Sequence, residues 1–288
     1  MTATSHSRYI TDQGHQLAVY DWSLPDDALP RALVLLVHGL GEHSSRHDAL
    51  ALHLNTLGFA VRGFDQHGHG YSDGKRGALP EQTRLLDDLA ELVDDTHRML
   101  RRTFDQPVPV LLLGHSMGGA VAAQFVALAR RPVAGLVLSS PAFDPGLRPW
   151  QKRLLALLHS RWPNLRLANG LKVPRLCRDP YVVQAYQRDN RVHSRVSVRL
   201  AHFIAEAGRA AVSSAPLWTV PTLLLYAGQD HLVNPAGSRA FASGAPPCVQ
   251  AHCFADCYHE LFNEPEPSRG EVLACLQTWL DVQFPASN

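Results

Sequence analysis

The stretch that decides the fold is VPVLLLGHSMGGAVAAQFVALAR, residues 108–130. It opens with a short apolar run without alternation, which is typical of a strand buried on both faces of a sheet. The pentapeptide Gly114 to Gly118, of the form G-x-S-x-G, follows directly, and an apolar helical pattern comes after it. A sharp turn from strand to helix exposes a serine hydroxyl above the sheet. The stretch therefore predicts that Ser116 is a nucleophile.

Two other interpretations of the pentapeptide are weaker. A chance occurrence at the start of a helix would leave the strand in front of it unexplained. A phosphate-binding loop would need the lysine and the hydroxyl residue of a Walker sequence, and both are missing here.

Similar apolar runs on both sides of this stretch indicate further buried strands, and residues 83–104 have the spacing of an amphipathic helix. Strands that alternate with helices predict an α/β fold with a mostly parallel central sheet flanked by helices. QLAVYDW (16–22) and the strand at 32 are interpreted as an antiparallel opening edge. The expected buried strands are ALVLLV (32–37), FAVRGF (59–64), VPVLLL (108–113), GLVLSS (135–140) and TLLLYA (222–227).

The alternation stops at Pro141 and resumes at TLLLYA. Between them lie arginine-rich amphipathic helices, RPWQKRLLALLHSRW (148–162) and VSVRLAHFIAEAG (196–208). We predict that residues 1–140 and 221–288 form the core, and that residues 141–220 form a helical cap inserted after the sixth strand.

Composition excludes several classes of protein. The chain has 288 residues, 45% of them hydrophobic and 18% charged, with scattered Gly and Pro, which excludes disorder, collagen and coiled coil. No apolar run approaches the roughly 18 residues of a membrane helix, and the first residues, MTATSHSRYI, lack the features of a secretory signal. Five cysteines favour free thiols in a reducing cytoplasm. A net charge of +1 gives no indication of a nucleic-acid partner.

A serine nucleophile needs a histidine base held by an acid, and in this fold they follow in the order Ser, Asp, His. Asp230 follows the strand TLLLYA, at the end of the sheet where a carboxylate points into the crevice. Asp144 is the substitute acid, and a turn or cap role is the alternative for Asp230. His259 lies in a loop after the expected strand CVQAHCF, whereas its competitor, His252, lies within that strand.

The oxyanion of the reaction needs two backbone N–H donors. Met117, the residue after the nucleophile, supplies one. Leu40 is predicted to supply the other from the loop His38-Gly39-Leu40-Gly41, because glycines on both sides let its N–H turn toward the site.

Two clusters resemble metal sites, and we assign a metal to neither. The loop from Asp65 to Gly74 contains H-x-H, but its glycines are typical of a compact turn that supports the oxyanion loop. The other cluster has no usual zinc-ligand spacing. It consists of His252, Cys253, Cys257 and His259. We therefore expect no metal and no cofactor.

Five ordered motifs together resemble the monoacylglycerol lipase and lysophospholipase branch of the serine α/β-hydrolases. They are HGLGEHSSRH, DQHGHGYSDGKRG, GHSMGG, AGQDHLV and CYHELFNEPE, and the resemblance runs from about residue 9 to 282. It implies the α/β-hydrolase fold and an esterase that cleaves the acyl ester of monoacylglycerol-like or lysophospholipid molecules through an acyl-enzyme. By the same resemblance Ser116, Asp230 and His259 form the triad.

The resemblance also implies roles for residues near the alcohol end of the substrate. Glu42 and Arg46 match positions that shape the pocket around glycerol, and Phe262 stands where animal lipases of the family have a second histidine.

Other functions stay open beside the esterase. The same triad could hydrolyse thioesters or amides, or transfer an acyl group, and hydrolase folds can also become binding proteins, although these usually lose a member of the triad.

The predicted cap is strongly basic. Residues 146–212 contain 13 of the 27 Lys and Arg but only three of the 26 Asp and Glu. Apolar residues beside Lys152, Arg153 and Arg161 have the composition of a helix that lies on an anionic lipid surface. The alternative is that this helix only covers the pocket and that its cations are solvated.

Overall fold

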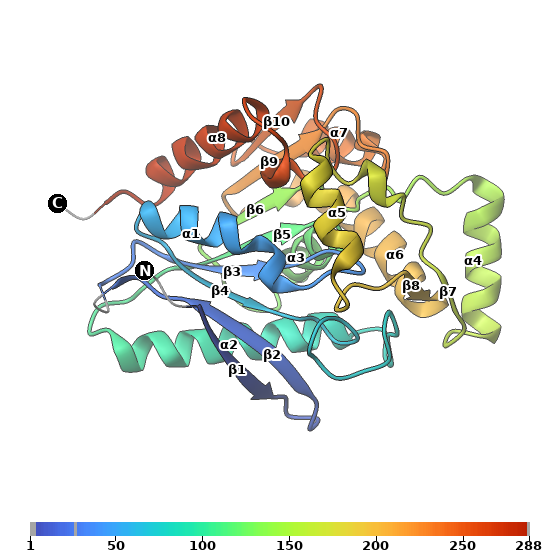
Figure 1. Ribbon diagram of the computed structural model, residues 1–288, viewed down its shortest axis with the longest axis horizontal. Coiled ribbons are helices and arrows are strands. Elements are labelled where there is room, and N and C mark those ends of the chain that lie inside the picture. Colours follow the sequence, from blue (N-terminus) through green and yellow to red (C-terminus); the bar gives the residue numbers. More distant parts are fainter. Residues whose placement is uncertain (1–3, 26–27, 287–288) are drawn as a thin grey trace.

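An eight-stranded sheet with helices on both faces forms the body of the molecule (Figure 1). The computed structural model describes residues 4–25 and 28–286, so residues 1–3 of the segment without signal features lie outside the described residues. The strand order is β1-β2-β4-β3-β5-β6-β9-β10. The strands are β1 (Thr4–Ile10), β2 (Gln16–Trp22), β3 (Leu33–Val37), β4 (Ala60–Phe64), β5 (Val110–His115), β6 (Gly135–Ser139), β9 (Thr222–Ala227) and β10 (Val249–Phe254).

The sheet is parallel except at one edge. β1 pairs with β2 and β2 pairs with β4 in antiparallel fashion, and the remaining strands pair in parallel. The expectation that residues 16–22 pair with the strand at 32 is wrong. All five residues of β3 are buried, so β3 belongs inside the sheet, between β4 and β5. The antiparallel partners of residues 16–22 are β4 on one side and, on the other, Thr4–Ile10, whose polar sequence gives little sign of a strand.

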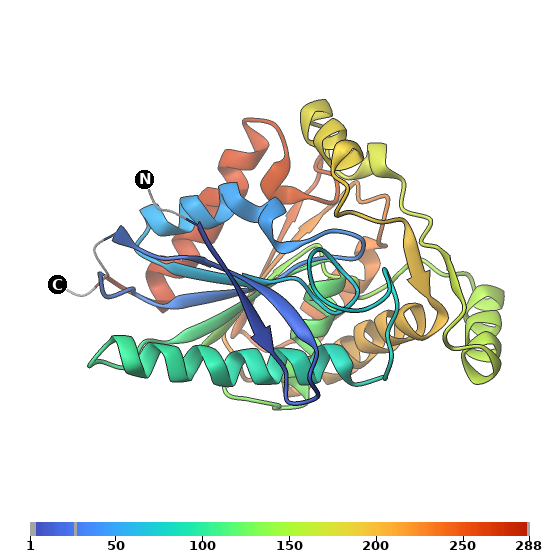
Figure 2. The ribbon, with the colours of Figure 1, turned by 60° about the horizontal axis from the view of Figure 1, so that its bottom comes forward.

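The two faces of the sheet carry separate apolar cores. Along β3, Leu33, Leu35 and Val37 belong to one core, while Val34 and Leu36 belong to the other, as the alternation of side chains in a strand requires. The first core includes buried residues of α2, α3 and α6, and the second includes those of α1 and α8. Figure 2 shows α1 and α8 on one side of the sheet and α2 on the other. The helices outside the insertion are η2 (Ser44–His47), α1 (Asp48–Thr56), α2 (Arg84–Thr103), α3 (Met117–Ala127), α7 (Pro235–Gly244), η5 (Leu261–Asn263) and α8 (Ser268–Gln283).

The chain leaves the sheet after β6 and returns to it at β9. α6 packs against α3 and buries its apolar face in the first core. α4 lies at the margin of the molecule (Figure 1), and within the described chain none of its side chains is buried. The elements between β6 and β9 are α4 (Pro149–Arg161), β7 (Arg166–Ala168), η3 (Val173–Arg175), α5 (Pro180–Arg188), β8 (Arg195–Ser197), α6 (Val198–Ser214) and η4 (Ala215–Leu217).

Among residues 4–25 and 28–286, we find no helix with both the length and the apolar character to cross a bilayer.

Candidate active site

Ser116 occupies a strained turn between β5 and α3. Its backbone angles are φ 53° and ψ −118°, a region that residues other than glycine rarely enter. Two hydrogen bonds hold this conformation: the Ser116 N–H donates to the Ser139 carbonyl at 3.0 Å, and the Ser116 carbonyl accepts from the Ala142 N–H at 2.9 Å. The strain is therefore supported by the strand beside β5 and by the loop that follows that strand.

The glycines of the pentapeptide let the turn close. A Cβ added at Gly114 would lie 2.6 Å from the carbonyl oxygen of Gly118, which is closer than real Cβ contacts. Any side chain at position 114 would therefore push the start of α3 away from β5.

His259 and Asp230 form a buried pair at the carboxyl ends of the strands. The His259 Nδ1 lies 2.6 Å from the Asp230 Oδ2, and both side chains are at most 3% exposed. The Asp230 Oδ1 accepts hydrogen bonds from the N–H groups of Leu232 and Val233 at 2.8 and 3.0 Å. Because an ionised carboxylate only accepts hydrogen bonds, Nδ1 carries the proton and Nε2 is left as the proton acceptor.

The pair also sets the protonation of its two members. Burial lowers the pKa of His259, but the charge and hydrogen bond of Asp230 outweigh it, so the pKa of His259 lies above its ordinary value. Burial raises the pKa of Asp230, but the interaction with His259 and the two backbone N–H groups bring it below the ordinary value. Asp230 thus stays ionised and favours the imidazolium that forms when the histidine accepts a proton.

The competing residues lie elsewhere. The carboxylate of Asp144 accepts from the Asn234 side chain at 2.8 Å and from the Gly146 N–H at 2.9 Å, and His252 lies on the exposed edge strand β10. The ring of His259 instead lies 4.9 Å, between ring centroids, from that of His115, the residue before Ser116. The structure thus places His259, the predicted base, near the turn that carries Ser116.

The predicted oxyanion loop contacts the nucleophile turn. A Cβ added at Gly39 would lie 3.2 Å from the Ser116 Cβ. Among the hydrogen bonds of the described residues, none uses the Leu40 N–H. Met117 is the first residue of α3, where backbone N–H groups have no partner within the helix. Both predicted donors therefore border the position of Ser116.

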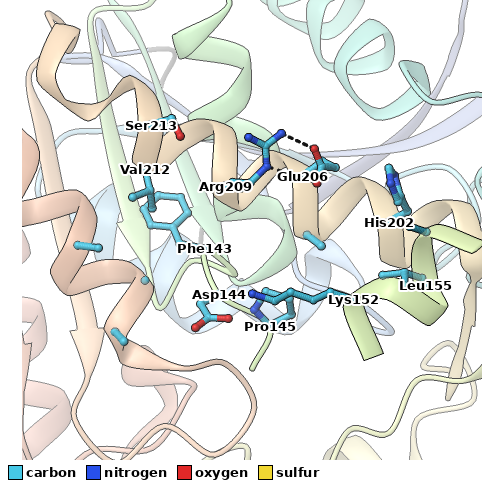
Figure 3. Close-up of a pocket in the computed structure, with 15 residues that line it drawn as sticks. Phe143, Asp144, Pro145, Lys152, Leu155, His202, Glu206, Arg209, Val212 and Ser213 are labelled. Atoms are coloured by element: carbon cyan, nitrogen blue, oxygen red, sulfur yellow. Dashed lines mark hydrogen bonds and ion pairs between the residues drawn. The ribbon is translucent and has the colours of Figure 1, made fainter. Parts of the chain in front are cut away.

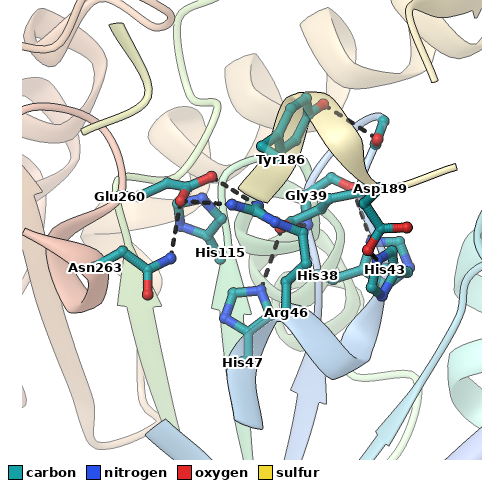
Figure 4. A network of polar contacts seen from close by, with 12 residues as sticks. His38, Gly39, His43, Arg46, His47, His115, Tyr186, Asp189, Glu260 and Asn263 are labelled. Carbon is teal, nitrogen blue, oxygen red and sulfur yellow. Dashed lines mark hydrogen bonds and ion pairs between the residues drawn. The ribbon is translucent and has the colours of Figure 1, made fainter. Parts of the chain in front are cut away.

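A buried ionic network connects the oxyanion loop with the loop of His259 (Figure 4). Arg46 contacts Glu42 at 2.5 Å and binds Glu260 through two nitrogens at 2.8 and 2.9 Å. Glu42 also accepts the Gly39 N–H at 2.5 Å. Burial raises the pKa of both carboxyls, but the cationic neighbours, among them Arg46, outweigh it, so both pKa values lie below the ordinary value. The Arg46 guanidinium is shared between two carboxylates that support different parts of the site.

Sequence reasoning missed Glu260 and the cap residues that contact the oxyanion loop. Glu260 follows His259 directly, and that adjacency was the one available signal. The Tyr186 hydroxyl donates to the Gly41 carbonyl at 3.2 Å, and the His193 N–H donates to the same oxygen at 3.0 Å. Both residues come from the basic insertion, where the sequence pattern indicates only amphipathic helices and loops.

The clusters that resemble metal sites have other surroundings. Asp65 accepts from the Ser44 N–H at 2.8 Å and from the Tyr71 N–H at 2.8 Å, and Gln66 binds the backbone of His38. In the part of the chain that the structure describes, no three His, Cys, Asp or Glu side chains are grouped as metal ligands would be. Phe262 is buried among apolar residues of the second core.

A cavity of about 370 Å³ lies between α4, α6 and α7 (Figure 3). Phe143, Leu155 and Val212 supply apolar parts of its wall, and Lys152 and Asp144 supply charged parts. Phe143 directly follows Ala142, whose N–H binds the Ser116 carbonyl. One residue of the cavity wall, Phe143, is therefore the sequence neighbour of a residue that contacts Ser116 directly.

The mostly parallel sheet and the strained serine turn between β5 and α3 define an α/β-hydrolase. Residues 28–266 match the family described as Serine aminopeptidase, S33, and the chain belongs to this family. It is 32% identical to a monoacylglycerol lipase of Mycolicibacterium smegmatis over 97% of both chains. It is 31% identical to phospholipase YtpA of Bacillus subtilis, over 88% of this chain and 96% of the other.

A solved structure agrees with these relatives. The monoacylglycerol lipase of Paleococcus ferrophilus is 31% identical and superposes with a TM-score of 0.80 over 93% of this chain and 99% of its own. The resemblance inferred from the motifs is confirmed, as are the α/β-hydrolase fold and the enzyme class, a serine carboxylic ester hydrolase.

Proposed function

We propose that the chain hydrolyses the acyl ester of monoacylglycerols through an acyl-enzyme on Ser116. The observation that carries the proposal is the buried contact of 2.6 Å between His259 and Asp230, next to the strained serine turn. A serine hydroxyl becomes a useful nucleophile only beside such an oriented base. The similarity to the monoacylglycerol lipases of Mycolicibacterium smegmatis and Paleococcus ferrophilus supports the substrate class.

The residues act in two half-reactions. The Ser116 Oγ attacks the acyl carbonyl carbon while its proton passes to the His259 Nε2. The oxygen of the tetrahedral intermediate becomes an anion and accepts the N–H groups of Leu40 and Met117. As the intermediate collapses, the glycerol oxygen leaves with the proton from His259. A water molecule then repeats the sequence on the acyl-enzyme and releases the fatty acid.

The cavity between α4, α6 and α7 is the proposed site of the acyl chain, because its wall is largely apolar and includes Phe143, the residue after the one whose N–H binds the Ser116 carbonyl. Glu42, Arg46 and Phe262 are assigned to the alcohol side. Glu42 and Arg46 act there through the ionic network, and Phe262 acts by filling apolar space in the second core, three residues after the base.

We retain residues 1–140 and 221–288 as the core and residues 141–220 as the cap. The packing of α6 on α3 supports a cap that is anchored at its C-terminal end. The exposed apolar and cationic side chains of α4 support peripheral contact with an anionic lipid surface. Exposed apolar residues on or next to this helix include Trp150, Leu154, Leu157 and Trp162.

Lysophospholipid is the second candidate substrate. Arg175 and Arg178 line a surface cavity that also includes Tyr258, the residue before His259, and the Arg175 guanidinium donates to the Tyr258 hydroxyl at 2.9 Å. Arg178 is paired with the buried Glu264, so Arg175 is the cation that would contact a phosphate-bearing head group there. The similarity to a phospholipase points the same way.

A substrate panel tests the proposal. Wild type and Ser116→Ala are assayed against acyl substrates that share one oleoyl chain and differ in the leaving group: glycerol, methanol, glycerophosphocholine (from lysophosphatidylcholine) and a thiol (from a thioester). The proposal predicts that wild type has its highest kcat/KM on the glycerol ester and that Ser116→Ala hydrolyses no substrate of the panel. Faster cleavage of the lysophospholipid would favour the second candidate, and faster cleavage of the thioester would contradict both.

A further inference from the structure

The imidazole of His38 lies fully buried just beyond the end of β3, beside the predicted oxyanion loop. Its Nε2 accepts the backbone N–H of Gln66 at 2.9 Å, and its Nδ1 lies 2.8 Å from the carbonyl oxygen of Gly39. A backbone N–H can only donate, so Nε2 is the unprotonated nitrogen. The proton is therefore on Nδ1, which donates to the Gly39 carbonyl. Gln66 thus fixes the tautomer of His38.

The surroundings keep this ring neutral and in place. Burial lowers the pKa of His38, although Asp65 and Glu42 act in the opposite direction. The edge of the His69 ring packs against it at 5.2 Å between centroids. The Gln66 side chain also donates to the His38 carbonyl at 2.6 Å. Both the ring and the backbone of His38 are held by the same neighbouring loop.

The carbonyl that His38 binds belongs to the same peptide group as the Leu40 N–H. A trans peptide is planar, so its C=O and N–H point in opposite directions, and fixing one fixes the other. This peptide would otherwise turn easily, because turning it changes the ψ angle of Gly39, and glycine has no Cβ to restrict that angle. A turned peptide would present a carbonyl oxygen, instead of an N–H, toward Ser116.

We propose that His38 is a positioning residue that holds the Gly39–Leu40 peptide with the Leu40 N–H directed at the oxyanion. The proposal rests on the function assigned to Ser116 above. Glu42 fixes the other side of Gly39 by accepting its N–H. The donor at Leu40 is thus oriented by two buried side chains, and only the bond from His38 acts on the donor peptide itself.

Three substitutions separate the hydrogen bond from the bulk of the ring. His38→Asn keeps a donor one bond beyond Cγ, where Nδ1 stands, whereas His38→Gln places its amide near the position of Nε2. His38→Ala keeps neither. Loss of one oxyanion donor typically costs on the order of 10²–10³ in kcat, so we expect kcat to fall at least about tenfold in His38→Ala and His38→Gln. His38→Asn should recover most of that loss, and KM should change little in all three.

The matched control is His53→Asn. His53 is a half-buried histidine of α1 and belongs neither to the oxyanion loop nor to the loop that holds His38, so this variant should keep its kcat. Equal kcat losses in His38→Asn and His38→Gln would assign the effect to packing and overturn the proposal. Wild-type kcat in His38→Ala would overturn it as well.

A measurement without substrate tests the same arrangement. The ¹⁵N chemical shifts of the wild-type imidazole should show the proton of His38 on Nδ1 at neutral pH, and a proton on Nε2 would overturn the inference. Failure of the proposed function appears differently, as ester hydrolysis that is absent from wild type or survives in Ser116→Ala. In that event the nitrogen shifts still decide whether His38 holds the Gly39 carbonyl.

Discussion

Arg46 binds Glu260, the residue directly after His259, through two nitrogen–oxygen contacts of 2.8 and 2.9 Å. The same guanidinium contacts Glu42, which accepts the Gly39 N–H. The loop that carries the predicted oxyanion donor and the loop that carries the predicted base are therefore joined through one buried cation. Movement of either loop would break contacts of the other.

Replacing Arg46 by methionine should strongly destabilise the protein. The change leaves two carboxylates buried without their cation, which typically costs about 3–5 kcal/mol in the free energy of unfolding. Denaturant unfolding at pH 7.5 measures the loss. Arg269→Ala, which breaks the exposed contact with Glu266, is the control and should have no measurable effect.

The loss in the free energy of unfolding caused by Arg46→Met should depend on pH. In wild type the folded-state pKa values of Glu42 and Glu260 are lowered, so their contribution to stability is present above the unfolded value of about 4.3 and is lost on acidification. Without the guanidinium, burial dominates and raises both pKa values. The gap between wild type and variant should therefore narrow as the pH falls toward about 4. A gap that stays constant would contradict this account of the network.

Ser116→Gly should be more stable than Ser116→Ala. Both substitutions remove the hydroxyl and should abolish hydrolysis and labelling by a fluorophosphonate probe. Only glycine adopts the φ of 53° without steric cost. We expect a stability difference of about 1 kcal/mol, or about 2–4 °C in Tm, measured by thermal unfolding. Equal Tm values would show that the turn is unstrained, and labelling that persists would exclude Ser116 as the nucleophile.

Activity should fall on the acidic side. His259 must be neutral to accept the serine proton, so kcat/KM should decrease as the pH drops through its pKa, which lies above about 6.5. Asp230→Asn removes the charge that raises this pKa. It should shift the acidic limb of the profile to lower pH and reduce kcat by about 10⁴. Turnover close to wild type in this variant would point to another acid, and Asp144→Asn is the comparison.

Filling the cavity under α4 should change chain-length selectivity. Ala205 lines this cavity from α6, and Ala205→Trp places an indole where the acyl chain is proposed to lie. We expect kcat/KM on oleoyl glycerol to fall at least about tenfold, in line with the few kcal/mol that a lost apolar contact costs. An acetyl ester needs no cavity and serves as the internal control. Equal losses on both esters would indicate a general disturbance of the site.

The exposed cations of α4 should bind anionic vesicles. Each cation near such a surface contributes about 1 kcal/mol and is screened by salt. Co-sedimentation with phosphatidylserine vesicles at low salt should therefore exceed that with phosphatidylcholine, and a Lys152→Ala, Arg153→Ala, Arg161→Ala variant should lose the difference. Vesicle binding that depends on neither salt concentration nor lipid charge would contradict the proposal, and α4 would then only cover the cavity.

Much of the fold follows from patterns along the chain. The five expected buried strands begin or end within two residues of β3, β4, β5, β6 and β9, because strands buried on both faces give unbroken apolar runs. The helix expected at 83–104 is α2, Arg84–Thr103. β1 escaped prediction because an edge strand exposed to solvent needs no apolar pattern.

The site could be predicted only in part. Ser116, Asp230 and His259 follow from their order and from the strands that precede them. Glu260 could not be assigned, because its function depends on Arg46, more than two hundred positions away in the sequence. The contacts of Tyr186 and His193 with Gly41 depend on how the insertion folds back over the sheet, and local patterns carry no information about that path.

The double contact on the Gly41 carbonyl divides the insertion into an exchangeable and a fixed portion. Within the part of the chain that the structure describes, no hydrogen bond joins residues 149–168, which contribute α4 and β7, to that carbonyl. In contrast, α5 and the loop after it supply the Tyr186 hydroxyl and the His193 N–H. A chimaera that takes its first cap helix from a relative can keep the native segment 180–193 intact. Transplanting the whole insertion would instead require the oxyanion loop of the same relative. Segment 180–193 and the oxyanion loop should therefore come from the same parent in any chimaera.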